Sequence, residues 1–587
     1  MKKYLFVIIT ILTVFGVSAQ FSEDKSKFAK EFQKAVSSYG NGPFMDFVRG
    51  DFSEMMEQSN LPDDYFKKMV NVANKMTEKR MSAYPFIYNY VYSVSSFVLQ
   101  NQTPKSFYAW NKAAEELLNG RNMNKYKDFI AFSSLFFSDR ILSDKANFNW
   151  YYLGGNFAFE YDKKLMFTCS EGRLACKVIN KNKNKNKVPF IDSIVIANTS
   201  GEYDPIRQKW SGSGGILNWE KVGLDKDKNF AELKTYEVST RVANFSADSI
   251  MLTTFYFKEP IAGRIIDRAF KANREEDKVY PQFSSYEKRL PIKNIKPNVD
   301  YDGGFALQGA NFVGIGFPNE PASMIIFREG SKFITAKSQE FIVSDRQISG
   351  FNTSISLLMN NDEDSITHPG LNFQYVLDRK SVELTRTKSG NGQSPFFNSY
   401  HQLDMYMPKL IWKTDSKDLK MAYEIGTSQA QKIARFESKN YFDGQLYDKL
   451  QGMESIHPLV AIYTYCYENA IYTMPEGNLA TALHKTVEQI KPLFLELANY
   501  GFINYDTEAK MITVNQKLDN FVKSKAGKVD FDNLIFVTDL RKKELRGYTP
   551  EQIEKDPNLS YIQAEYNVLN EKRRQMPEFG TLSLSSM

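Results

Sequence analysis

The chain has 587 residues, of which 42% are apolar and 14% aromatic, and it carries a formal net charge of +6. This apolar content is sufficient for buried cores and excludes a globally disordered chain. The small net charge gives no basis for a nucleic-acid-binding protein. At roughly 150 residues per domain, the length predicts about three to five domains.

The first 19 residues predict a cleavable secretory signal. Lys2 and Lys3 precede an apolar stretch over 4–17, and small residues occupy the cleavage positions at 17–19. An apolar stretch of about 14 residues is shorter than the ~20 needed to cross a bilayer, which favours cleavage over a membrane anchor. We therefore expect an exported protein, in the periplasm or on the outer cell surface, with no transmembrane segment after cleavage.

Residues 20–145 predict a helical domain, because apolar side chains recur there at helical spacing. Thr103 and Pro104 mark the start of one helix, and Gly120 marks its end. Several helices begin about 20 residues apart, which is typical of antiparallel pairs in a bundle or in a short helical-repeat array. Both alternatives remain open. The apolar stripes include Phe28/Phe32/Ala35/Tyr39, Tyr65/Met69/Val72/Met76, Ile87/Val91/Val94/Val98 and Phe107/Trp110/Ala114/Leu117.

Residues 146–425 predict an all-β region of one or two domains. Apolar and polar residues alternate from Phe157 to Tyr161, and Gly-rich turns at 211–215 and 389–392 separate short strands. This pattern is compatible with two β-sandwiches or with one β-solenoid. Because small and apolar residues alternate over 305–316 as at a solenoid corner, we predict a β-solenoid or β-helix-like stack.

Residues 426–540 predict a winged-helix-like domain. Three short helices followed by a β-hairpin are expected over 457–514, and the third helix begins with the capping box formed by Thr486 and Gln489. The last segment, 541–587, predicts a charged tail that contains one helix.

The winged-helix-like domain is not expected to bind DNA. The helix in the recognition position carries Lys491 together with Glu488 and Glu496, whereas a DNA-reading helix needs net positive charge to displace counterions from phosphates. An exported chain also has no genome to contact. We therefore expect a structural or protein-docking role for this domain.

Three cysteines are present. Cys169 and Cys176 lie close together in a strand-rich segment, and an oxidising compartment would allow them to pair. Two unpaired cysteines on neighbouring strands are equally compatible with the sequence. Cys466 is interpreted as a small buried apolar side chain.

One segment resembles the start of a calcium-binding loop. Asp225, Asp227 and Asn229 have the spacing of the first oxygen ligands. However, Phe230 occupies the position where the sharp turn needs Gly, and Tyr236 replaces the final Glu. We therefore predict a solvated turn. Three cysteines and four scattered histidines likewise do not make a zinc site.

A hydroxyl, an imidazole and a carboxylate fall within six residues at Ser399, His401 and Asp404. A nucleophilic triad requires such groups to converge in space, usually from separate elements, and local hydrogen bonding in a turn explains the segment equally well. His368 is also expected in a turn. We assign no catalytic, cofactor-binding or metal-binding residue and no cofactor.

Carbohydrate chemistry would need exposed aromatic rings or paired carboxylates on a groove. The sequence alone cannot pair the carboxylates of the β region. Four tryptophans of this region would suit stacking on sugars, but burial in a core is the expected outcome. They are Trp150, Trp210, Trp219 and Trp412.

Three segments resemble large exported proteins of Bacteroidota-type bacteria: 147–155 (NFNWYYLGG), 210–219 (WSGSGGILNW) and 368–375 (HPGLNFQY). The resemblance implies that this chain is an N-terminal portion of a longer protein, and it carries no catalytic residues. We expect an exported cell-envelope or surface protein with a structural or partner-binding role. The alternative is a polysaccharide-binding or polysaccharide-degrading protein acting through the β region. Envelope proteins or glycans are the expected partners, and nucleic acid is not.

Overall fold

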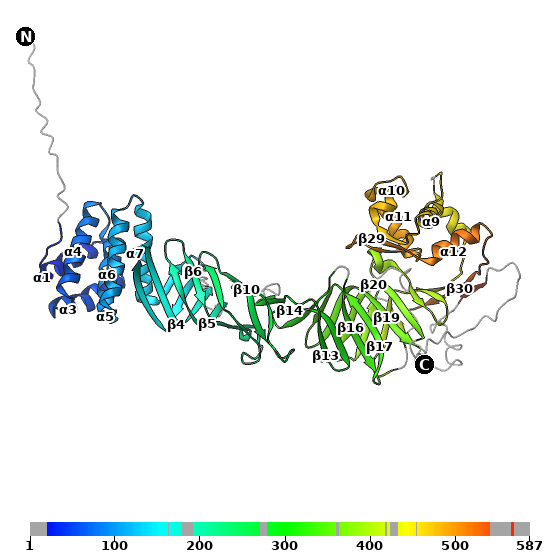
Figure 1. The fold of residues 1–587 in the computed structure, drawn as a ribbon, viewed down its shortest axis with the longest axis horizontal. Helices are drawn as coiled ribbons and strands as arrows, with labels where there is room; N and C mark the ends of the chain where they lie inside the picture. The colour runs from blue at the N-terminus through cyan, green and yellow to red at the C-terminus, as the bar shows by residue number, and fades with distance from the viewer. Residues whose placement is uncertain are drawn as a thin grey trace, which may run out of the picture. The chain divides into compact units, whose positions relative to one another are not determined.

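The computed structural model describes residues 20–162, 164–178, 192–270, 279–317, 320–359, 363–416, 419–422, 433–452, 455–540 and 565–568. The predicted signal at 1–19 and most of the predicted tail at 541–587 lie outside these residues. The described part of the chain forms two compact units. Unit 1 runs to residue 255 and includes 259–282, and unit 2 comprises 256–258 and the residues from 283 onward (Figure 1).

Unit 1 begins with a helical region. Helix α1 starts where the Asp24 side chain accepts a hydrogen bond from the Lys27 amide, and its buried stripe is formed by Phe28, Phe32 and Val36. The predicted helix start at Thr103 is confirmed, because its side chain accepts from the Ser106 amide. The helices are α1 (Lys25–Ser37), α2 (Phe44–Arg49), α3 (Asp51–Glu57), α4 (Asp63–Glu78), α5 (Tyr88–Leu99), α6 (Pro104–Asn119) and α7 (Met123–Asp139), with a short π-helix over Ala83–Ile87.

An antiparallel sheet follows in unit 1, with the long strand β4 at its centre. β4 pairs with β2 and β3 along one edge and with β5 along the other, and β5 leads to β6–β9 and to β7–β8–β10–β11. The strands are β1 (Ile141–Asp144), β2 (Phe148–Leu153), β3 (Asn156–Asp162), β4 (Lys164–Val178), β5 (Ser193–Asp204), β6 (Lys209–Ser213), β7 (Ile216–Asn218), β8 (Phe230–Glu232), β9 (Thr235–Ser239), β10 (Asn244–Thr253) and β11 (Ile261–Arg268).

The helices of unit 1 pack directly on its first strands. The ring of Phe97 in α5 lies 5.7 Å from that of Phe159 in β3, and the ring of Phe132 in α7 lies 5.3 Å from that of Phe167 in β4. The Phe159 amide also donates to Ser106 Oγ at 2.8 Å. Helices and sheet therefore share one aromatic core.

Unit 2 contains a closed six-stranded antiparallel barrel. The strands pair in the cycle β14–β15–β18–β19–β17–β16 and back to β14. Closure leaves no free edge among these six strands. They are β14 (Val299–Gln308), β15 (Asn311–Ile315), β16 (Ala322–Arg328), β17 (Ser331–Ser338), β18 (Glu340–Val343) and β19 (Gln347–Met359).

The predicted solenoid is therefore wrong. The segment over 305–316 forms most of the β14–β15 hairpin, in which Gln308 lies opposite Asn311. Gly314 in this segment and Gly303 just before it make room for the ring of Tyr301, because a Cβ on either would lie 2.5 or 2.4 Å from that side chain. The segment thus belongs to a barrel hairpin, in which Gly314 accommodates one tyrosine, and not to a solenoid corner.

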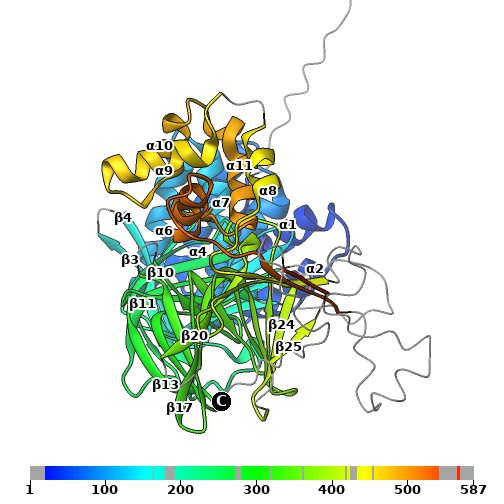
Figure 2. The ribbon, with the colours of Figure 1, turned by 90° about the vertical axis from the view of Figure 1, so that its right-hand side faces the viewer.

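A second sheet extends from the barrel strand β19. β19 pairs with β20, from which one branch runs through β21, β24 and β25 and the other through β22, β23, β26 and β30. Figure 2 shows β20, β24 and β25 of this sheet. The remaining strands of unit 2 outside its helical part are β12 (Gln282–Ser285), β13 (Leu290–Lys296), β20 (Asp364–Val376), β21 (Ser381–Thr385), β22 (Phe396–Asn398), β23 (Leu403–Tyr406), β24 (Lys409–Lys413), β25 (Leu419–Ala422), β26 (Ile433–Ser438), β30 (Leu534–Asp539) and β31 (Glu565–Val568).

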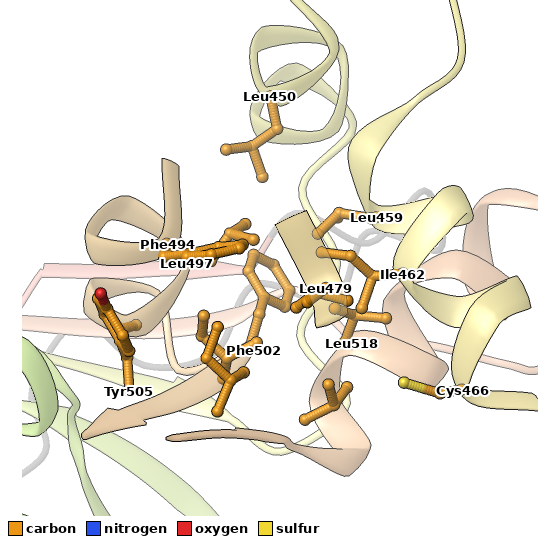
Figure 3. Close-up of a cluster of buried hydrophobic side chains, with 14 of the residues drawn as sticks. Leu450, Leu459, Ile462, Cys466, Leu479, Phe494, Leu497, Phe502, Tyr505 and Leu518 are labelled. Carbon is orange, nitrogen blue, oxygen red and sulfur yellow. The ribbon is translucent and has the colours of Figure 1, made fainter. Parts of the chain in front are cut away.

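The helical part of unit 2 contains five helices and a three-stranded sheet. The order α9–β27–α10–α11–β28–β29 contains the three helices and the hairpin expected over 457–514, and the predicted capping box at Thr486 is confirmed. Figure 3 shows side chains from several of these elements meeting in one core. The elements are α8 (Gly444–Gln451), α9 (Pro458–Asn469), β27 (Thr473–Pro475), α10 (Glu476–Ala482), α11 (Val487–Asn499), β28 (Ile503–Asp506), β29 (Met511–Val514) and α12 (Gln516–Lys525).

None of the helices in the described residues combines the length and apolar character needed to cross a membrane. In the predicted C-terminal tail, the four described residues form strand β31, which pairs with β30, where a helix was expected.

Candidate functional site

Ser399, His401 and Asp404 do not form a triad. Ser399 Oγ donates to Asp364 Oδ1 at 2.8 Å, and His401 is exposed, with its ring against that of Tyr400. Asp404 instead binds Lys517. The proximity of the three residues in sequence thus reflects a turn between β22 and β23.

His368 lies within strand β20, where a turn was expected. Its Nε2 lies 2.8 Å from the Ser394 carbonyl oxygen, and its Nδ1 accepts from the Gly370 amide at 3.1 Å. Burial lowers the pKa of His368 to about 3, so the ring is neutral at physiological pH. Both ring nitrogens bind backbone, which makes this a structural histidine.

The segment that resembles a calcium loop is a turn whose oxygens accept hydrogen bonds from the protein itself. Asp225 Oδ1 accepts from the Asp227 amide, and the buried Asn229 accepts from Thr254 through its side-chain oxygen. The oxygens of Asp225 and Asn229 thus have partners within the protein. Among the residues that the structure describes, no group of three or more His, Cys, Asp or Glu side chains is arranged to hold a metal ion.

The cysteines and tryptophans are core residues. Cys169, Cys176 and Cys466 are free and buried, and burial raises the pKa of the Cys176 thiol to about 12. The four tryptophans considered for sugar stacking are also buried. The indole of Trp150 donates to the Val242 carbonyl, which satisfies its one polar group.

A buried cluster of charges joins α12 to strands β23 and β26; we call it the Lys517 network. Lys517 Nζ lies 2.6 Å from Asp404 Oδ2, 3.0 Å from Glu437 Oε2 and 2.9 Å from Tyr406 Oη. All three ammonium donors therefore have acceptors. Arg435 Nη2 lies 2.6 Å from the second oxygen of Glu437, which gives two cations for two carboxylates.

The Lys517 network is structural in character. Burial alone would lower the pKa of Lys517, but the acidic groups around it outweigh that effect and raise its pKa well above the usual value. The Tyr406 hydroxyl donates to the Tyr500 carbonyl at the end of α11, which adds a second link between sheet and helices. Because each charge is paired and hydrogen-bonded, the network holds the helices on the sheet.

Unit 1 contains a second buried charge cluster. Lys221 Nζ lies 2.6 Å from Asp267 Oδ1 and 3.7 Å from Asp192 Oδ1. Asp267 is 2% exposed, and burial raises its pKa to about 6, an effect that Lys221 opposes. Asp192 also accepts from the amides of Ser193 and Phe270. The cluster ties 192–193 to the end of β11.

A polar hollow on the second sheet of unit 2 is the strongest candidate for a functional site. Directly opposed residues on neighbouring strands share a face, so the register defines a row of side chains across β18, β19, β20, β21 and β24. The first row is Ile342, Ser349, Gln374, Glu383 and Ile411.

A second row consists of the residues two positions away from the first-row residues on the same strands. Asn372, Thr385 and Lys409 lie opposite one another, and Glu340 and Phe351 occupy the matching positions on β18 and β19. A hollow of about 370 Å³ is lined by the second row and by the part of the first row that lies on β18, β19 and β20. We call it the Phe351 groove. Its volume lies within the range of about 300–1,000 Å³ found for ligand pockets.

A β-bulge presents Phe351 to solvent. The pairing of β19 with β20 shifts between Gly350 and Thr353, and Asn352 has a positive φ of 47°. A Cβ on Gly350 would lie 2.5 Å from Thr353 Oγ1 and 3.0 Å from the Phe341 ring, so a larger residue would have to displace these side chains. Bulges re-aim side chains, and here the Phe351 side chain remains 58% exposed.

The charges of the Phe351 groove are largely compensated. Lys409 Nζ lies 2.5 Å from Glu383 Oε2, and Arg379 lies 3.9 Å from the other oxygen of that carboxylate. Exposed Asn372 and Gln374 add amide groups, each with donors and acceptors. The lining therefore offers hydrogen-bonding groups and one aromatic ring, and it has no large excess of positive or negative charge.

A second hollow, of about 470 Å³, lies on the outside of the barrel. Two of its carboxylates are held in ion pairs: Asp300 with Lys293 at 2.7 Å, and Asp302 with Arg289. Burial alone would raise the pKa of Asp300, but its hydrogen bonds with Lys293 and the Asn294 amide bring it below the usual value. These carboxylates stabilise strand pairing.

Comparisons with family models, with curated proteins and with solved structures found no match to this chain. Its candidate site therefore rests on the chemistry of its own residues. Sequence reasoning missed the Phe351 groove because its lining comes from five strands whose register is set by long-range pairing. The only local signal was the sequence Gly350–Phe351–Asn352, an aromatic residue between two turn-forming residues.

Proposed function

We propose that this chain is an exported cell-envelope or surface protein that binds a partner, and that the Phe351 groove is the binding surface. Export rests on the charged, apolar and small-residue segments of residues 1–19. The resemblance of three segments to exported Bacteroidota-type proteins supports the same compartment.

One observation carries the proposal of binding: the bulge that keeps Phe351 exposed. A phenylalanine that is 58% exposed leaves most of its apolar surface in water, and the bulge at Gly350 and Asn352 holds it there. Exposed aromatic residues beside polar groups are enriched at binding surfaces. The groove is thus prepared for a contact outside the chain.

The lining favours binding over hydrolysis. Hydrolysis of a glycoside needs two carboxyl groups about 5 to 10 Å apart on opposite sides of the bond. Among the described residues that line the groove, Glu340 is the single carboxylate, and the adjacent Glu383 is tied to Lys409. The groove therefore supports retention of a partner better than it supports cleavage.

In-cell cross-linking of a tagged copy, followed by mass spectrometry, tests this proposal. We expect discrete cross-linked species and an N-terminal peptide that starts at Gln20. The species should be lost in a Phe351→Ala variant and kept in Phe255→Ala, because Phe255 is similarly exposed, at 57%, but lies in unit 1. Equal cross-linking of both variants, or none in the wild type, would contradict the proposal.

A further inference from the structure

We infer that the Phe351 groove takes a neutral saccharide. This inference rests on the proposed function, because it names the class of partner for the same surface. It follows from the ring, the amides and the charge of the groove.

The ring of Phe351 suits the apolar face of a sugar. A pyranose presents C–H groups on its faces and hydroxyls around its edge, and the negative face of an aromatic ring attracts those C–H groups. Phe351 is exposed at the margin of a hollow rather than buried in it, so one face can be covered by a ligand. The neighbouring Ile342, 40% exposed, extends the apolar surface.

The polar groups suit the edge of a sugar. Asn372 and Gln374 are two residues apart on β20, so both side chains project from the same face of the sheet. Each amide can donate and accept at once, as can the hydroxyls of Ser349 and Thr385. Sugar hydroxyls also donate and accept, so neighbouring hydroxyls can be matched without burying an unpaired polar group.

The charge of the groove points to a neutral ligand. An acidic polysaccharide or a phosphate would need a cation that is not already compensated. Lys409, the cation in the lining, lies 2.5 Å from Glu383. Glu340 is exposed at the opposite end of the row and would repel an anion.

The placement of the groove disfavours a peptide that binds by strand addition. Such a peptide needs the free backbone groups of a sheet edge. The groove instead crosses β19, β20 and β21, each of which is already paired on both sides. A ligand here must be recognised by side chains.

Titration calorimetry on residues 20–587 tests the inference. The probes are neutral gluco-, manno- and galacto-configured oligosaccharides, with uronate-containing and sulfated oligosaccharides as anionic comparators. We expect a neutral oligosaccharide to bind, and Phe351→Ala to weaken binding by about tenfold or more. Asn372→Ala with Gln374→Ala should weaken it similarly, whereas Phe351→Tyr and the control Phe255→Ala should leave it unchanged.

These variants separate the inference from folding and from the proposed function. The substituted side chains are exposed, and an unchanged circular dichroism spectrum confirms that each variant is folded. No neutral binding, binding of anionic sugars alone, or binding that Phe351→Ala leaves intact would overturn the inference. If a protein is then cross-linked at the groove, the proposed function stands without the saccharide.

Discussion

At the scale of single residues, two buried lysines are compensated by acidic neighbours rather than exposed to a ligand. Lys517 has three acceptors within 3.0 Å, and Lys221 lies between Asp192 and Asp267. Burying a charge costs several kcal/mol unless a partner and hydrogen bonds offset it. These residues therefore shape stability and its dependence on pH, while Phe351 and the amides beside it remain accessible.

Asp267→Asn tests this account through pH. The folded pKa of Asp267 is about 6 and its usual value is 3.8, so the folded state retains a proton that the unfolded state releases. The stabilisation from this group is complete below the lower value and is lost as pH rises through about 6. The difference corresponds to about 3 kcal/mol. We expect wild type to lose about this much stability, relative to Asp267→Asn, from about pH 4 to about pH 7.

Denaturant unfolding followed by tryptophan fluorescence measures the Asp267 effect. Of the five tryptophans, only Trp412 lies in unit 2, so a Trp412→Phe background makes the signal specific for unit 1. A stability difference that is independent of pH, or one that favours the wild type as pH rises, would contradict the assignment.

At the scale of elements, α12 carries a buried link between the helices and the sheet of unit 2. Lys517→Met would leave Asp404 and Glu437 buried without their shared cation. Removing one partner of a buried pair typically costs about 3–5 kcal/mol. We expect this loss in the unfolding free energy, together with faster hydrogen exchange of the α12 amides.

Lys525→Met is the matched control for Lys517, because it lies on the same helix. Its ion pair with Asp448, at 3.1 Å, joins side chains that are 43% and 70% exposed. Such a surface pair contributes about 0–1 kcal/mol. Equal effects of the two substitutions would show that the Lys517 network does not hold the helix.

Local signals in the sequence predicted several elements well. The Thr103–Pro104 start and the Gly120 end of α6, and the capping box of α11, depend on contacts within a few residues, so the sequence contains all that is needed. The helical spacing places Lys517 on the same face of α12 as the buried residues Phe521 and Ser524. This position was a similar local signal, and it could have predicted the Lys517 network.

Strand pairing was less predictable. Alternation of small and apolar residues over 305–316 fits a solenoid and a barrel hairpin equally well. Alternation indicates which side chains share a face of the strand, but it does not indicate which strand pairs with it. The barrel closes through β15–β18 and β14–β16, contacts that no short segment encodes. The Phe351 groove could not be predicted for the same reason, because its two rows of side chains form only when five strands pair in register.

At the scale of the whole molecule, each unit has its own core, and unit 2 supplies the candidate binding surface. The barrel and the second sheet share β19, so the bulge at Gly350 is supported by pairing on both sides. The helical part of unit 2 is fixed to the same sheet by the Lys517 network. Unit 2 therefore provides a rigid support for the groove, as a binding site requires.

Site-specific photo-cross-linking in cells that export the protein tests the central claim most directly. A photoreactive phenylalanine analogue is placed at position 351, and in a second copy at position 255, where the native ring is equally exposed. We predict discrete adducts from position 351 that are absent from position 255, and adducts that shift on glycosidase treatment if the partner is a saccharide. No adduct at 351, or the same adducts at both positions, would contradict the assignment of the Phe351 groove as the partner-binding surface.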